Sequence, residues 1–238
     1  MILAIARQTS REALRRALPA AIFGATLLLA AASRALLPPS FASADAEIAS
    51  VAVSAVLLAG LASAVLLGTP LVARDLERGT LTLVLSKPAG LAAYVLGRGL
   101  GLAASCAALS LAVAAAVPPI FAWIGGARLG SILTSYYITS CAACLLAVLV
   151  VGSAAIAVSS FASRASGPLL VVMLLVAGSV GLPAPLAFLL PDFRHFGIAA
   201  RPAPPLGLLA AYGLLFSSIF LLVAYIVLSI RPPMRGQG

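Results

Sequence analysis

Few side chains in this sequence have the types and spacing that catalysis or metal binding requires. Ser179 lies in the stretch AGSVG, which resembles the surroundings of an intramembrane nucleophile, and His195 is the only histidine in the chain. His195 follows in a separate proline-rich segment, which argues against a serine–histidine hydrolase. Cys141 and Cys144 have the C-x-x-C spacing of metal and redox sites, but in a long apolar run cysteine behaves as a small apolar residue. We therefore predict no catalytic residue, no metal site and no cofactor, and do not expect an enzyme.

The densest group of charges falls between two long apolar runs, within VARDLERGTLTLVLSKPAG. Glycine can end the charged helical turn in the left-handed region, and the threonine after it can cap the next turn. The apolar stretch 81–85 needs a surface to rest on, which an ordinary solvated loop does not. The pattern predicts a short element that docks on another protein, here called the docking segment. Its predicted contact residues are Arg74, Asp75, Glu77, Arg78, Gly79 and Thr80.

Composition determines what kind of molecule positions these residues. The chain is 63% hydrophobic and only 9% charged, with a mean hydropathy of +1.17, so it lacks the charge that a water-soluble domain needs. A helix needs about 20 apolar residues to cross the hydrocarbon core of a bilayer. The sequence therefore predicts an all-α membrane protein, a single domain over 1–238 with six transmembrane helices. The predicted spans are 18–37, 48–72, 91–117, 132–160, 168–190 and 206–230.

Acidic residues are missing from the middle of every predicted span. Ion-coupled carriers usually place Asp or Glu at mid-membrane, where it binds the coupling ion. The six acidic residues of this chain fall instead in terminal or linking segments. An apolar path of this kind fits a lipid-like or amphipathic cargo better than a highly charged one.

Lys and Arg are distributed unevenly between the two sides of the predicted bundle. Eleven of the 15 basic residues fall in the N-terminal segment, in the links after the second and fourth spans, and at the C-terminus. Because basic loops stay on the cytoplasmic side, both termini and the docking segment are predicted to face the cytoplasm from the inner membrane. The net charge of +9 then reflects topology and attraction to anionic membrane lipids, not nucleic acid binding.

The N-terminal segment 1–17 predicts an amphipathic helix that lies on the membrane surface. Arg7, Arg11 and Arg15 follow one face at a spacing of four residues, and small or apolar residues follow another. Glu12 can pair with a following arginine at helical spacing. Such a helix places its arginines among lipid phosphates. Whether it only anchors the topology or also docks a partner stays open at this point.

Three stretches resemble the ABC type-2 permeases, the membrane subunits of ATP-driven exporters. ERGTLTLVLSKPAGLAAYVLGRGLG, at 77–101, resembles the first cytoplasmic link of that family, with Arg98 where Lys is usual. ARQTSREALRRAL, at 6–18, and LLPDFRHFGIAA, at 189–200, resemble segments of the subgroup described as permeases for multicopper enzyme maturation. The positions that match in the first stretch are Glu77, Gly79, Thr80, the apolar turn 81–85, Pro88, Tyr94 and Gly97.

The resemblance implies a partner and an architecture. The docking segment would be a coupling helix seated in a cytoplasmic ABC ATPase subunit, two permease subunits would pair as a homodimer or heterodimer, and a re-entrant segment would precede the last span. The chain has no G-x-x-x-x-G-K-[ST] loop for ATP, which agrees with a separate ATPase. Gly97 and Gly101 have the spacing of close helix packing. Copper-related members of the subgroup keep a copper role for Cys141 and Cys144 open.

The expected function is thus the transmembrane subunit of an ATP-driven exporter, which forms the translocation path and couples to separate ATPases. Two alternatives stay open. A haem-exporter-like subunit of cytochrome maturation has the same number of spans. An ATP-independent membrane scaffold or secondary carrier would need no ATPase partner.

Overall fold

All regular secondary structure in the described part of the chain is α-helical. The computed structural model describes residues 1–36, 45–77, 90–125, 133, 135–163, 166–180 and 205–230. Within them no strand occurs, as the composition predicted. The helices are α1 (Ile2–Leu14), α2 (Ala17–Leu36), α3 (Asp45–Glu77), α5 (Gly90–Gly125), α7 (Ser135–Phe161), α8 (Gly167–Val180) and α10 (Leu206–Ile230).

Four helices are long and apolar enough to cross a membrane, namely α3, α5, α7 and α10. Helix α2 meets the same criterion only together with α1, from which it is bent by 59°. Helix α8 is a shorter apolar helix, and the rest of the predicted span 168–190 lies outside the described residues. The structure thus supports four to five of the six predicted spans. The predicted re-entrant segment also lies outside the described residues.

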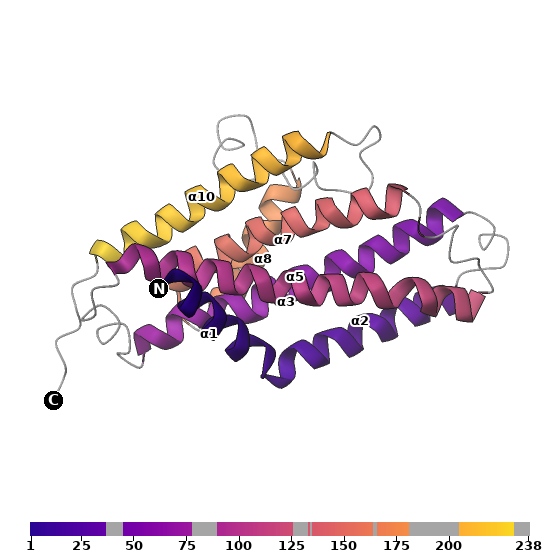
Figure 1. The fold of residues 1–238 in the computed structure, drawn as a ribbon, viewed down its shortest axis with the longest axis horizontal. Helices are drawn as coiled ribbons and strands as arrows, with labels where there is room; N and C mark the ends of the chain where they lie inside the picture. Colours follow the sequence, from indigo (N-terminus) through magenta and orange to yellow (C-terminus); the bar gives the residue numbers. More distant parts are fainter. Residues whose placement is uncertain are drawn as a thin grey trace.

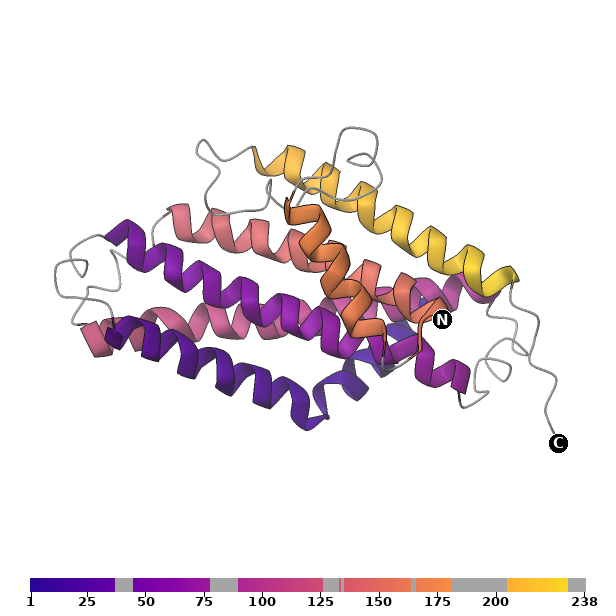
Figure 2. The ribbon, with the colours of Figure 1, turned by 180° about the vertical axis from the view of Figure 1, so that it is seen from behind.

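The long helices pack side by side into one elongated bundle (Figure 1). Helices α3, α5 and α7 form its centre, α2 packs on α3 and α5, and α10 packs mainly on α7. Seen from behind, α8 crosses the bundle obliquely (Figure 2). Small residues allow the close approach at the centre: a Cβ atom on Gly60 would overlap Val148, and one on Gly68 would lie 2.8 Å from Cβ of Ala155.

Hydroxyl side chains within the spans are mostly satisfied by their own helix. Thr26 donates to the carbonyl oxygen of Ile22 at 2.7 Å, and Thr69 donates to that of Val65 at 2.8 Å. Such bonds keep polar side chains compatible with an apolar environment. They explain how spans that contain Ser and Thr stay regular helices.

Two helix ends differ from the sequence-based prediction. Helix α5 continues through Pro118 and Pro119 to Gly125, although the predicted span ended at 117. Val117 and Phe121 are fully buried, so their packing stabilises a helix that proline alone would weaken. Helix α3 continues beyond residue 72 to Glu77, so the first charges of the docking segment belong to its last turn.

One end of the bundle collects segments that are far apart in the sequence. Helix α1 lies there beside the start of α5, near the last turn of α3 and the last turn of α10 (Figure 1). This end is the only place among the described residues where ion pairs occur. This end of the bundle is therefore the candidate functional site.

Candidate functional site at the α1–α3–α5 junction

Helix α1 lies against α5 because two glycines leave room for it. A Cβ atom on Gly97 would lie 2.8 Å from Cβ of Ile5, and one on Gly101 would lie 2.5 Å from the carbonyl oxygen of Ala6. Thr9 is buried in the same contact. The predicted packing role of Gly97 and Gly101 thus falls between α5 and the N-terminal helix. The predicted apolar face of α1 is used for protein contact.

Arg98 and Asp75 form the most buried ion pair of this junction. The guanidinium Nη2 of Arg98 lies 2.5 Å from the carboxylate Oδ2 of Asp75, and the Tyr94 hydroxyl donates to the same oxygen at 2.5 Å. Only 12% of the Arg98 side chain and 16% of the Asp75 side chain are exposed. The guanidinium also lies 5.6 Å from the centre of the Tyr94 ring, within cation–π range. This pair joins the last turn of α3 to α5.

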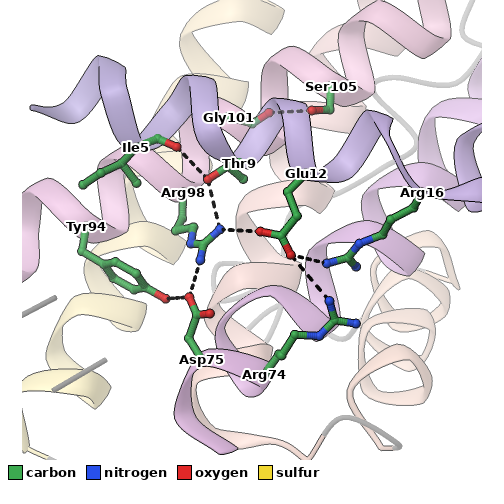
Figure 3. A network of polar contacts seen from close by, with 10 residues as sticks. All are labelled: Ile5, Thr9, Glu12, Arg16, Arg74, Asp75, Tyr94, Arg98, Gly101 and Ser105. Atoms are coloured by element: carbon green, nitrogen blue, oxygen red, sulfur yellow. Dashed lines mark hydrogen bonds and ion pairs between the residues drawn. The ribbon is translucent and has the colours of Figure 1, made fainter. Parts of the chain in front are cut away.

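Glu12 extends the network to α1 (Figure 3). Its Oε1 accepts a hydrogen bond from Arg16 at 2.6 Å and lies 3.5 Å from Nη1 of Arg74, and its Oε2 lies 3.6 Å from Nη1 of Arg98. Arg98 also donates to the Thr9 hydroxyl at 3.2 Å. Burial by itself raises the pKa of the Glu12 carboxyl, but the hydrogen bond from Arg16 and the charges of the surrounding arginines hold it below its ordinary value.

We call this group the polar junction. Three guanidinium groups surround two carboxylates. Each carboxylate is contacted by at least one arginine from another helix. Both acids therefore act as anchors between helices. The arrangement can fix three helices relative to one another. The members of the polar junction are Thr9, Glu12, Arg16, Arg74, Asp75, Tyr94 and Arg98.

The predicted docking residues that the structure describes separate into two groups. Arg74 and Asp75 lie in the polar junction, where Asp75 holds α5 and Arg74 approaches Glu12 of α1. Glu77 is exposed at the end of α3. The remaining predicted contacts, Arg78, Gly79 and Thr80, lie outside the described residues.

Sequence reasoning missed the role of Arg98 and Tyr94 as partners of the charged turn. A signal was present, because Arg98 lies two turns inside an apolar helix and an arginine there needs a carboxylate or water. The pairing of Glu12 with Arg16 was within the predicted alternatives and is confirmed. Its contacts with Arg74 and Arg98 depend on tertiary packing.

The other chemical candidates do not join this site. Cys141 and Cys144 are buried in the apolar core between α3, α5 and α7. Ser179 lies near the end of α8, where its hydroxyl donates to the carbonyl oxygen of Leu175 at 2.8 Å. His195 lies outside the described residues. Within the part of the chain that the structure describes, no three His, Cys, Asp or Glu side chains gather to hold a metal.

Comparison with known proteins identifies the family of this chain. A family model described as "ABC-2 family transporter protein" matches residues 19–230. The chain belongs to the ABC-2 transporter family. The search for individual curated relatives found no match.

Membership of the ABC-2 transporter family agrees with the apolar helices of the fold and makes the chain a multi-pass membrane protein of a transport system. Members of this family are membrane transport subunits and not enzymes themselves. The match includes the α3 and α5 parts of the polar junction. It begins after α1, so Glu12 lies outside the matched residues.

Proposed function

We propose that this ABC-2 protein is the transmembrane subunit of an ATP-driven exporter, working with cytoplasmic ABC ATPase subunits and a second permease subunit. The observation that carries the proposal is the position of Glu77. It is exposed at the end of α3, only two residues beyond a carboxylate that is tied to α5. A force applied to the docking segment therefore reaches two spans at once.

The polar junction supports this role through its connectivity. Asp75 links α3 to α5, and Glu12 links both helices to α1. Buried, mutually bonded charges hold one discrete arrangement better than apolar contacts that can slide. In the proposed function this end of the bundle faces the cytoplasm of the inner membrane, in agreement with the distribution of basic residues. The spans then carry an uncharged or amphipathic cargo.

Charge reversal at Glu77 tests the proposal. The tagged chain is purified from its native membranes, and the ATPase subunits that remain bound are identified and quantified by mass spectrometry. E77K should lower the amount of ATPase retained by about tenfold or more. The reversed charge would face the positive groups of the ATPase that bind Glu77 in the proposal, and such repulsion at an interface costs more than about 1.4 kcal/mol. Thermal stability of the purified chain should stay unchanged, since Glu77 is exposed.

The matched control is E47K, the same change near the opposite end of the same helix. It should leave ATPase retention at the wild-type level. Retention that is equal in wild type, E77K and E47K would contradict the docking role of Glu77. Purification without any ABC ATPase, from the native membrane, would contradict the proposed function as a whole.

A further inference from the structure

One face of α1 remains uncovered by the bundle and is strongly basic. Arg7 and Arg11 lie on this face, and Arg15 caps the helix at its C-terminus; all three are exposed. Successive arginines of this row are four residues apart, which is about 6 Å along a helix. No carboxylate among the described residues forms an ion pair with any of the three. Their charges are thus available to a ligand.

The same arginines border a hollow between α1 and the end of α3. The hollow has a volume of about 640 Å³ and is lined by five arginines, of which Arg74 comes from α3. The carboxylate of Glu12 also lines it, but this group is already bound by Arg16 and the neighbouring guanidinium groups. The hollow is therefore a concave, positively charged site. Guanidinium groups bind phosphate oxygens in paired hydrogen bonds, so phosphate is the ligand chemistry that fits.

The edge of the basic face indicates where this phosphate comes from. Leu3 is 80% exposed and Leu14 is 49% exposed. At helical spacing Leu3 neighbours Arg7 and Leu14 neighbours Arg11. Leucine beside arginine is well placed where lipid headgroups meet acyl chains, because leucine enters the apolar layer while arginine binds phosphate.

The site is also formed before any ligand binds. The opposite face of α1 is held by α5 through Gly97 and Gly101, and Glu12 anchors α1 to both α3 and α5. A free amphipathic peptide must fold when it binds a membrane, whereas this helix is already in place. Charge then contributes most of the selectivity for the ligand, and the binding should depend strongly on salt.

We propose that the hollow between α1 and the end of α3 binds the phosphate headgroup of an anionic phospholipid. The neighbouring leucines rest on the acyl chains of the surrounding lipid. The site distinguishes anionic from zwitterionic lipids by net charge. This inference concerns lipid recognition and does not depend on the proposed coupling to an ATPase.

Native mass spectrometry of the purified full-length chain in detergent tests the site. The chain is titrated with phosphatidylglycerol or with phosphatidylcholine. The wild type should bind phosphatidylglycerol more tightly, and binding should weaken as salt rises from about 0.1 to about 0.5 M. The variant R7Q/R11Q/R15Q should lose phosphatidylglycerol affinity on the order of 100-fold, since each basic residue near an anionic surface contributes about fivefold.

Two matched variants separate charge from other effects. R7K/R11K/R15K keeps the charge and should retain most of the binding. R34Q removes one arginine near the far end of α2 and should leave binding unchanged. Equal affinity for the two lipids, or salt-independent binding by the wild type, would overturn the proposal even if the glutamine variant failed to fold. Loss of a co-purifying ATPase with unchanged lipid binding in the glutamine variant would also overturn it, and would assign the face to a protein partner.

Discussion

Asp75 and Arg98 are ionised side chains in a molecule with very little charge, and their stability depends on each other. Removing an ion from water is costly, and the attraction between partners offsets that cost only when the geometry is close and the other polar atoms are bonded. Here Asp75 receives hydrogen bonds from both Arg98 and Tyr94, and Arg98 also reaches Thr9 and Glu12. Of the Arg98 nitrogens, Nε has no hydrogen-bond partner among the described residues. The pair therefore holds one arrangement of α3 against α5.

The substitution D75N tests how strongly the chain depends on this pair. It removes the negative charge but keeps the side-chain volume, so Arg98 is left largely buried without its main counter-ion. The expected loss is about 3 kcal/mol of stability, which corresponds to a fall in the thermal midpoint on the order of 6–12 °C. The midpoint is measured by fluorescence during heating of the purified chain in detergent.

Two controls calibrate the effect of D75N. The substitution E77Q changes an exposed acid two residues away on the same helix and should leave the midpoint within error. Y94F removes one hydrogen bond but leaves both charges paired, so it should cost only about 1 kcal/mol. If D75N and E77Q gave the same midpoint, Asp75 would not be an anchor of the junction.

At the scale of single elements, the position of α1 depends on two glycines of α5. At Gly101 a Cβ atom would lie 2.5 Å from the carbonyl oxygen of Ala6 and 2.6 Å from Cβ of Thr9. Backbone atoms cannot rotate away as a flexible side chain can, so the whole of α1 must shift. The contacts of Glu12 with α3 and α5 would lengthen as a consequence.

The substitution G101A should therefore destabilise the chain by about 1–3 kcal/mol, the usual cost of overpacking. Limited proteolysis should also cut within α1 sooner than in the wild type. The control is G152A in α7, where the added Cβ would lie 3.6 Å from Leu102, an ordinary contact distance. Early cleavage of α1 in G152A, or none in G101A, would show that this helix is held by something else.

The helices themselves were largely predictable from the sequence, because long apolar runs separated by charge or proline specify spans with little ambiguity. The ends were less predictable. Pro118 and Pro119 suggested a break, but full burial of Val117 and Phe121 keeps α5 helical past them. The charged turn at Asp75 was predicted as a separate element, whereas it continues α3 because its charges find partners on α5.

The polar junction could be predicted only in part. The charged turn at 74–78 and the glycine spacing at 97–101 were visible as local patterns. Their connection was not, because Glu12, Asp75 and Arg98 are brought together by the packing of three helices. Only the presence of Arg98 inside an apolar helix pointed to a hidden partner, and it did not say which one.

At the scale of the whole molecule, we expect the junction to make α1, the end of α3 and the start of α5 move as one body. Helix α10 packs mainly on α7 and has fewer contacts with α5. A push on the docking segment would then move the first group of helices relative to the rest of the bundle. In the proposed exporter, alternating access would come from that relative movement and not from bending of α1 against α5.

Linking α1 to α5 covalently tests whether they move together. The hydroxyl oxygens of Ser10 and Ser105 lie 3.3 Å apart, so cysteines at these two positions would bring their sulfur atoms near each other. In S10C/S105C, copper phenanthroline should oxidise the pair readily, and thiol labelling after unfolding measures the extent. ATP hydrolysis by the co-purified ATPase should be the same before and after oxidation, because the bond joins parts that do not separate. The single variants S10C and S105C control for the oxidant. Hydrolysis that falls on oxidation and recovers with a reductant, in the double variant alone, would show that α1 moves against α5 during each cycle.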